Sequence, residues 1–221
     1  MRPGDANEVV EAYRYVMQLR HQPAALVLSR QPLPTVDRCR YAPATGVARG
    51  AYVLADPPGG NPEVIFIASS SELSLAVDAH ETLLVEGIRS RVVSMPSWDI
   101  FDHQPEEYRD EVLPPNVKAR VAVEQASTLG WERYVASSGH VIGMTTFGAS
   151  APPEGTSEEV RIRARPGRGH REGATGQTVS TRVPAASSTP GPTVLRVWVR
   201  GFRLVSSNPG SQVSEERKGA S

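Results

Sequence analysis

Residues 63–95 read EVIFIASSSELSLAVDAHETLLVEGIRSRVVSM. The first part, EVIFIAS, is a short continuous apolar run, which is typical of a strand buried on both faces of a sheet. SSELSLAVDAHETLLVEG follows it as a predicted helix, with Ser70 or Ser71 as the expected N-cap and Gly87 as the stop. IRSRVVSM then indicates a second strand. A strand, a helix and a strand in this order predict a βαβ unit and hence a parallel sheet.

The same alternation continues on both sides of this unit. Residues 51–56, AYVLAD, indicate a strand, and the turn PPGGNP would join it to the strand at 63–69 as an antiparallel edge strand. We therefore predict an α/β fold with a mostly parallel sheet flanked by helices. The further expected elements are two short helices in 97–115, a strand in 118–126, a helix in 128–135 and a strand in 140–147.

The N-terminal stretch is shorter than a domain. Residues 5–20 have apolar side chains at helical spacing, and Asp5 with Glu8 three residues later forms a capping-box pattern. Residues 24–29, AALVLS, indicate a buried strand. One helix and one strand cannot enclose a core, so they would be the last αβ unit of a larger domain. The expected divisions are 1–34 for this unit, 35–49 for a linker, 50–152 for a small domain and 153–221 for a tail.

Composition narrows the class of protein. Twenty-four basic and 24 acidic residues give a formal net charge of zero, so no overall field favours nucleic acid or a membrane surface. The single cysteine, Cys39, excludes an internal disulfide and fits a reducing compartment. No secretory signal and no apolar run of membrane-spanning length are recognisable. We expect a cytoplasmic protein with no nucleic-acid or membrane partner.

Most other candidate side chains have ordinary interpretations. Asp5 and Glu8 are expected to be cap residues and not substrate ligands. His80 and His103 are expected at the surface, since neither has a second ligand at metal spacing. Glu124 ends a strand and is a candidate buried ion-pair partner. The aromatic residues expected in the core or at dimer contacts are Trp98, Trp131, Tyr134 and Phe147.

Several segments together resemble bacterial transketolases. They are RPGDANEVVEAYR, LVLSRQPLPT, GAYVLAD, SELSLAVDA, RVVSMPSWDIFDHQPEEYRDEVLPP, ARVAVEQASTLGWERYV and VIGMTTFGASAP, which follow one another from Arg2 to about Pro152. The combination of SRQ with LP, then SMPSW, then VLPP separates this family from related thiamine-dependent enzymes.

The resemblance implies a function and a position within a longer enzyme. Transketolases are homodimers of three α/β domains that use thiamine diphosphate and a divalent cation, Mg²⁺ or Ca²⁺. They transfer a two-carbon ketol unit from a ketose phosphate to an aldose phosphate. The resemblance places residues 1–34 at the end of the pyrimidine-binding domain and residues 50–152 in the C-terminal domain, without its last helix. It implies that the cofactor-binding residues and the catalytic histidines lie outside this chain, which alone would bind no cofactor and be inactive. The alternative is a non-catalytic remnant or interaction fragment.

One functional residue of the family maps onto this sequence. The arginine of the SRQ motif, which binds the sugar phosphate, corresponds to Arg30. A guanidinium at the carboxyl end of a parallel strand would lie where α/β sheets bind ligands, and its planar fork suits a phosphate. From the residues alone, an ion pair with a nearby carboxylate is the alternative. Pro32 stands where the family usually has Asn, which removes a backbone donor and restricts Gln31.

The sequence changes character at Pro153. Transketolases continue after FGASAP towards LKELQ and KFGF, whereas this chain has PEGTSEEVRIRARPGRG. Codons that encode the observed residues can be chosen so that removal of one C restores Pro-Leu-Lys-Glu-Leu-Gln-Arg-Lys-Phe-Gly-Phe. Our hypothesis is that residues 153 to about 180 are out of frame and that the tail is disordered. An Arg-rich segment that binds nucleic acid is the alternative, and residues 192–207 could form a local hairpin.

Overall fold

The computed structural model describes residues 1–136, 138–144, 160–164, 193–199 and 202–208. The chain divides into two compact units, Met1–Gly148 and Ala149–Ser221. No helix of the described residues is both long enough and apolar enough to cross a membrane.

The first unit is built on a five-stranded sheet with the order β1-β3-β2-β4-β5. Strands β2 to β5 pair in parallel, and β1 pairs with β3 in the antiparallel sense. The predicted α/β class with a mostly parallel sheet is confirmed. The strands are β1 (Tyr52–Ala55), β2 (Val64–Ala68), β3 (Ser90–Ser94), β4 (Arg120–Ser127) and β5 (His140–Met144).

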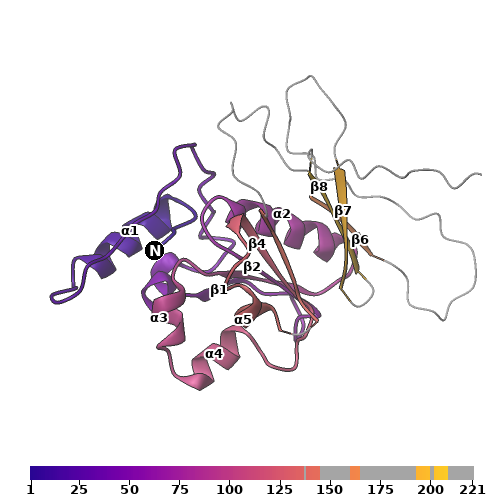
Figure 1. The fold of residues 1–221 in the computed structure, drawn as a ribbon. Helices are drawn as coiled ribbons and strands as arrows, with labels where there is room; N and C mark the ends of the chain where they lie inside the picture. The colour runs from indigo at the N-terminus through magenta and orange to yellow at the C-terminus, as the bar shows by residue number, and fades with distance from the viewer. Residues whose placement is uncertain (137, 145–159, 165–192, 200–201, 209–221) are drawn as a thin grey trace, which may run out of the picture. The chain divides into compact units, whose positions relative to one another are not determined.

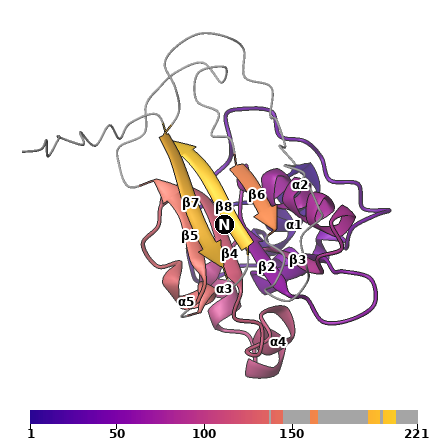
Figure 2. The ribbon, with the colours of Figure 1, turned by 90° about the vertical axis from the view of Figure 1, so that its right-hand side faces the viewer.

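Helices cover both faces of this sheet, with α2 on one side and α3, α4 and α5 on the other (Figures 1 and 2). Every residue of β2 is buried, as its continuous apolar run predicted. Alternate residues such as Ile65 and Ile67 pack with Phe101, Trp131 and other residues of the α3–α5 face in the main core. The helices are α2 (Glu72–Val85), α3 (Trp98–Asp102), α4 (Glu106–Val112) and α5 (Glu132–Val135).

The N-terminal helix α1 (Ala6–Val16) begins where the capping pattern predicted, because the side chain of Asp5 accepts a hydrogen bond from the Glu8 amide. Within α1, Glu8 and Ala12 are the buried residues. A 3₁₀ helix, η1 (Ala44–Arg49), lies in the predicted linker and buries Ala44 and Val47.

Two local expectations are wrong. Residues 24–29 form no strand, and Val27 and Leu28 are about half exposed, because no described strand pairs with them. Their segment is hydrogen-bonded to Met1 instead: the Met1 ammonium donates to the Ala25 carbonyl, and the Val27 amide donates to the Met1 carbonyl. Strand β1 is the predicted antiparallel edge strand, but it pairs with β3 and not with β2.

The start of α2 is confirmed in position, with Ser71 as the N-cap, but not in its side-chain contact. Ser71 precedes the helix with helical backbone angles, and its hydroxyl donates to the Glu72 carboxylate, so it makes no capping hydrogen bond. The helix stops before Gly87 as predicted, because Gly87 follows the C-cap Glu86 with a φ of 77°.

His80 also differs from the expected surface position, because it is 4% exposed and its Nδ1 lies 2.8 Å from the Ser90 hydroxyl. Desolvation lowers the pKa of His80 below its usual 6.5. Protonation therefore favours the unfolded chain, and this histidine removes stability as the pH falls below about 6.5, by at most about 1.4 kcal/mol per pH unit.

We therefore expect the free energy of unfolding to fall less between pH 6.5 and pH 5 in His80→Asn than in the unsubstituted chain. Urea titrations at both pH values measure this difference. His103→Asn is the matched control, because that side chain is 80% exposed. Equal pH dependence in the chain and in His80→Asn would contradict the assignment.

The second unit contains the strands β6 (Val160–Ala164), β7 (Thr193–Val199) and β8 (Phe202–Asn208). They form an antiparallel sheet with the order β6-β8-β7. The pairing of β7 with β8 matches the hairpin considered for residues 192–207, and the expected disorder of the tail stays a prediction. Phe147 and the other residues of the tail lie outside the part of the chain that the structure describes, although Phe147 itself belongs to the expected 50–152 domain.

Candidate functional site

The carboxyl edge of the parallel sheet is the position at which open α/β sheets usually bind ligands. Here Ser69 follows β2, Ser94 is the last residue of β3, and Glu124 follows the last β4 residue that pairs with β2; all three are buried. The N-terminal segment of the chain crosses this edge. The Arg2 amide donates to the Pro96 carbonyl at 2.7 Å, and the Ser70 amide donates to the Arg2 carbonyl at 3.1 Å.

The N-terminal segment packs so closely at Gly4 that a side chain would not fit there. A Cβ atom at Gly4 would lie 2.6 Å from Leu73 Cδ2 and 3.0 Å from the Ser70 carbonyl oxygen. The backbone therefore packs directly on the start of α2, and glycine is required here for the close approach.

An ion pair holds the first residues of the segment. The Arg2 guanidinium makes a bidentate contact with the Glu124 carboxylate, whose side chain is 1% exposed. The Ser69 hydroxyl lies 3.5 Å from the same carboxylate. Glu124 is thus the buried ion-pair partner that the sequence predicted, but its partner lies 122 residues away and no local pattern indicates it.

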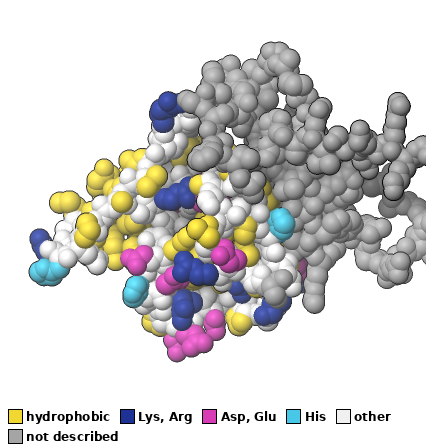
Figure 3. Space-filling model, viewed as in Figure 1, with side chains coloured by type: hydrophobic (Ala, Val, Ile, Leu, Met, Phe, Trp, Pro, Cys, Tyr) yellow, Lys and Arg dark blue, Asp and Glu magenta, His cyan; other side chains and the backbone are white. Residues whose placement is uncertain are grey.

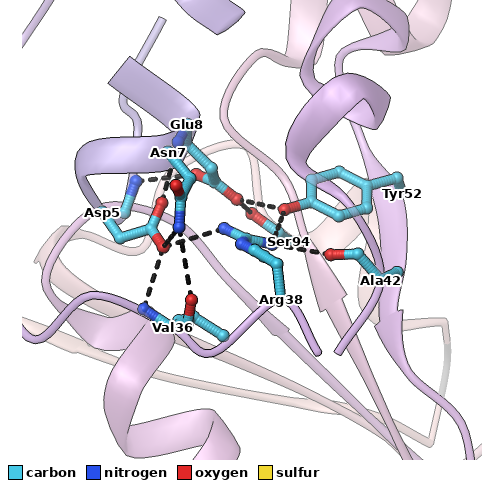
Figure 4. Close-up of polar contacts among 9 residues, drawn as sticks. Asp5, Asn7, Glu8, Val36, Arg38, Ala42, Tyr52 and Ser94 are labelled. Carbon is cyan, nitrogen blue, oxygen red and sulfur yellow. Dashed lines mark hydrogen bonds and ion pairs between the residues drawn. The ribbon is translucent and has the colours of Figure 1, made fainter. Parts of the chain in front are cut away.

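A second polar cluster joins α1 to the sheet (Figure 4). The Glu8 carboxylate accepts hydrogen bonds from the Tyr52 hydroxyl at 2.7 Å, the Ser94 hydroxyl at 2.6 Å and the Gly4 amide at 2.7 Å. Burial raises the pKa of Glu8, and the three donors oppose that shift. The expected role of Glu8 in capping is therefore extended by contacts with β1 and β3.

Asp5 and Arg38 complete this cluster, which we call the α1 network and define as Asp5, Asn7, Glu8, Arg38, Tyr52 and Ser94. Arg38 donates to the Asp5 carboxylate, the Tyr52 hydroxyl and the Ala42 carbonyl, each at 2.9 Å. Asp5 also accepts from the Val36 amide at 3.0 Å, and Asn7 donates to the Val36 carbonyl at 3.2 Å. The network thus fixes the segment that follows Arg30.

Arg30 takes part in none of the contacts of the two polar clusters. It is exposed, and among the described residues it makes no hydrogen bond or ion pair. The strand expected to present it is not formed, so the structure does not place Arg30 at the end of a buried strand. The contacts next to it are local: the Gln31 amide donates to the Ser29 hydroxyl at 3.1 Å.

The described residues do not fit a metal-bound diphosphate. No group of three or more His, Cys, Asp or Glu side chains in the described ranges is arranged to hold a metal ion. The buried carboxylates of Asp5, Glu8 and Glu124 accept hydrogen bonds from protein donors instead. We therefore assign these carboxylates a structural role in closing the edge of the sheet.

The remaining aromatic candidates lie in or beside the core. Trp131 and Tyr134 are buried, and Trp98 packs edge-on against Trp131 with ring centroids 4.9 Å apart. Cys39 is an exposed free thiol, and His103 is exposed as expected.

The chain is similar in sequence and in fold to known proteins. The family described as the transketolase-like C-terminal domain matches residues 50–163. A transketolase from Halalkalibacterium halodurans is 51% identical over 159 residues, which cover 72% of this chain and 24% of that protein. The chain therefore spans about a quarter of the length of the curated relatives that it matches.

Solved structures agree with the sequence matches. A transketolase from Leishmania mexicana is 41% identical with a TM-score of 0.62, over 69% of this chain and 21% of that one. A transketolase from Pichia stipitis is 38% identical with a TM-score of 0.59, over 67% of this chain and 21% of that one. By the match over residues 50–163, this chain belongs to the family of transketolase-like C-terminal domains.

Proposed function

We propose that this chain is the C-terminal part of a transketolase, in which Arg30 binds the phosphate of the sugar substrate. The reaction is the thiamine diphosphate-dependent transfer of a two-carbon ketol unit from a ketose phosphate to an aldose phosphate. Family membership carries this proposal. Structures of the Pichia stipitis enzyme are described as complexes with xylulose 5-phosphate and sedoheptulose 7-phosphate, which supports sugar phosphates as the substrate class.

The exposed guanidinium of Arg30 supports its role as a phosphate contact. Arg2, Arg38 and Arg120 are held by carboxylates or carbonyl groups of the protein, whereas Arg30 has no such partner among the described residues. A free guanidinium can make two parallel hydrogen bonds to phosphate oxygens.

We further propose that this chain is inactive alone and that thiamine diphosphate, with Mg²⁺ or Ca²⁺, is bound by residues outside its described part. The structural role of the buried carboxylates supports this view. As in the family, the working enzyme would be a homodimer. The exposed free thiol of Cys39 fits a cytoplasmic location.

An assay of the purified chain tests this proposal. With thiamine diphosphate, Mg²⁺, a ketose phosphate and an aldose phosphate, we expect no ketol transfer by the chain alone. We expect transfer when Met1–Gly148 replaces the matching part of the Halalkalibacterium halodurans transketolase. An inactive but folded chimera would favour the alternative, a fragment with no enzymatic role.

The Arg30→Met variant of this chimera tests the phosphate contact. Hydrogen bonds to charged groups contribute about 1.5–3 kcal/mol, so we expect the KM for a phosphorylated acceptor to rise about 10- to 150-fold. The KM for an unphosphorylated aldehyde should stay unchanged. The matched control is Arg20→Met, at another exposed arginine. An equal change for both acceptors would contradict a phosphate contact.

A further inference from the structure

Helix α1 is attached to the sheet mainly through polar contacts. Within the helix Glu8 and Ala12 are buried, whereas Val10, Tyr13 and Met17 at its end are 51%, 50% and 75% exposed. Figure 3 shows hydrophobic side chains gathered over this part of the molecule. These three side chains therefore contribute little apolar burial to the docking of α1, and the α1 network supplies its polar contacts with β1 and β3.

The charges in the α1 network do not balance when Glu8 is ionised. The groups that face Glu8 are Asp5 at the N-cap of α1, the Gly4 amide, Arg38 from the segment before η1, Tyr52 from β1 and Ser94 from β3. Arg38 contacts Asp5 and Tyr52, and it makes no hydrogen bond to Glu8 in the described structure. Two carboxylates would then share one guanidinium in a site from which solvent is excluded.

A proton on Glu8 removes this imbalance. The site then holds one carboxylate and one guanidinium, which form a pair. The hydroxyl groups of Tyr52 and Ser94 can each donate or accept, so they can bond to either form of the carboxyl group. An unpaired buried charge is costly, whereas a neutral carboxyl group with hydrogen-bond partners is much less so.

We propose that the α1 network is a proton-dependent latch, in which α1 docks on the carboxyl edge of the sheet with a proton bound to Glu8. The helix detaches more often as the pH rises. The latch holds the segment after Arg30 through Val36 and Arg38, and it sets the position of the exposed apolar face of α1. It does not depend on the proposed catalytic function.

The direction of the pH effect follows from linkage. Burial raises the pKa of Glu8 above its usual 4.5 in the docked state, and the nearby Asp5 adds to this effect. A detached, hydrated Glu8 returns to the usual value. Docking therefore takes up a proton at pH values between the two, and the docked fraction falls as the pH rises through this range.

Amide hydrogen exchange of the full chain tests the latch, because it reports the opening of α1 separately from global unfolding. Protection factors for the α1 amides are measured by mass spectrometry from pH 5 to pH 8 and corrected for intrinsic exchange. In the unsubstituted chain we expect protection to fall by up to about tenfold per pH unit. In Glu8→Gln, which mimics the neutral carboxyl group, protection should stay constant. Parallel slopes in the two proteins would overturn the proposal.

Two further variants keep the test decisive. Ser94→Ala removes a donor that lowers the pKa of Glu8, so the loss of protection should continue to a higher pH. If Glu8→Gln fails to fold, Ser94→Ala still tests whether the pH dependence of α1 docking comes from Glu8. Glu11→Gln is the control on the same helix, where Glu11 pairs with the exposed Arg14, and it should keep the slope of the unsubstituted chain. If Ser94→Ala leaves the pH range unchanged, the latch does not depend on Glu8.

Discussion

Arg2→Met is expected to lower the free energy of unfolding of the first unit by up to about 3–5 kcal/mol, because it leaves the buried Glu124 carboxylate without its partly exposed cationic partner. The substitution keeps most of the apolar stem of the side chain and removes the guanidinium. Glu124, which is 1% exposed, would remain as a charge without a cationic partner. The Ser69 hydroxyl at 3.5 Å cannot replace a bidentate contact.

Urea unfolding followed by circular dichroism measures this loss. The double variant Arg2→Met with Glu124→Gln should recover part of it, because the uncompensated charge is removed together with its partner. The matched control is Arg14→Met, which breaks an exposed pair with Glu11 and should cost less than about 1 kcal/mol. A loss from Arg2→Met as small as that of the control would show that the pair does not hold the N-terminal segment.

Trp131→Ala is the second substitution with a large expected effect, a loss of about 3–5 kcal/mol. Trp131 is 1% exposed and lies in the main core between α5 and the sheet. Its ring packs edge-on against Trp98 and lies 6.1 Å from the ring of Tyr134. Removal of the indole opens a cavity that these neighbours can fill only by moving.

The control for this substitution is two residues away. Leu129 is 79% exposed, so Leu129→Ala should change stability by no more than about 0.5 kcal/mol. The loss of stability in Trp131→Phe should lie between the losses in Trp131→Ala and Leu129→Ala, because Phe keeps an aromatic ring at the same site. Thermal unfolding of the three variants at one protein concentration gives the order. A loss from Trp131→Ala equal to that from Leu129→Ala would contradict the position of Trp131 in the core.

The N-terminal segment of the chain occupies the carboxyl edge of the sheet. In open α/β sheets that edge usually receives a ligand, but here Arg2 and Gly4 from the N-terminal segment pack against it. The C-terminal domain thus binds part of its own chain at the position where related folds bind small molecules. This arrangement joins the segment with Arg30 to the sheet through the α1 network.

The sequence by itself determined the features that depend on local periodicity. The continuous apolar run at 64–68 became the buried strand β2, and the α/β class followed from the alternation of strands and helices. Asp5 capped α1 because a cap needs only an acceptor and an amide three residues away. These contacts lie within one turn of chain, so a short stretch of sequence specifies them.

Tertiary structure alone decided the partners of each element. Apolar periodicity shows that residues 52–55 form a strand, but it does not say that β1 pairs with β3 and not with β2. The same limit explains residues 24–29, whose apolar run predicted burial although no strand among the described residues pairs with them. Burial requires a neighbouring surface, and the sequence of the segment does not contain that surface.

The buried carboxylates Glu124 and Glu8 show the same difference between what the local sequence and the tertiary structure determine. Glu124 was predicted to pair with some cation, and the three-dimensional fold selected Arg2 from 24 basic residues. Glu8 was predicted as a cap, and the packing of α1 on β1 and β3 placed it among Tyr52, Ser94 and Asp5. The sequence determined which groups could carry charge, whereas the long-range packing decided which of them are buried together and hence where a proton is favoured.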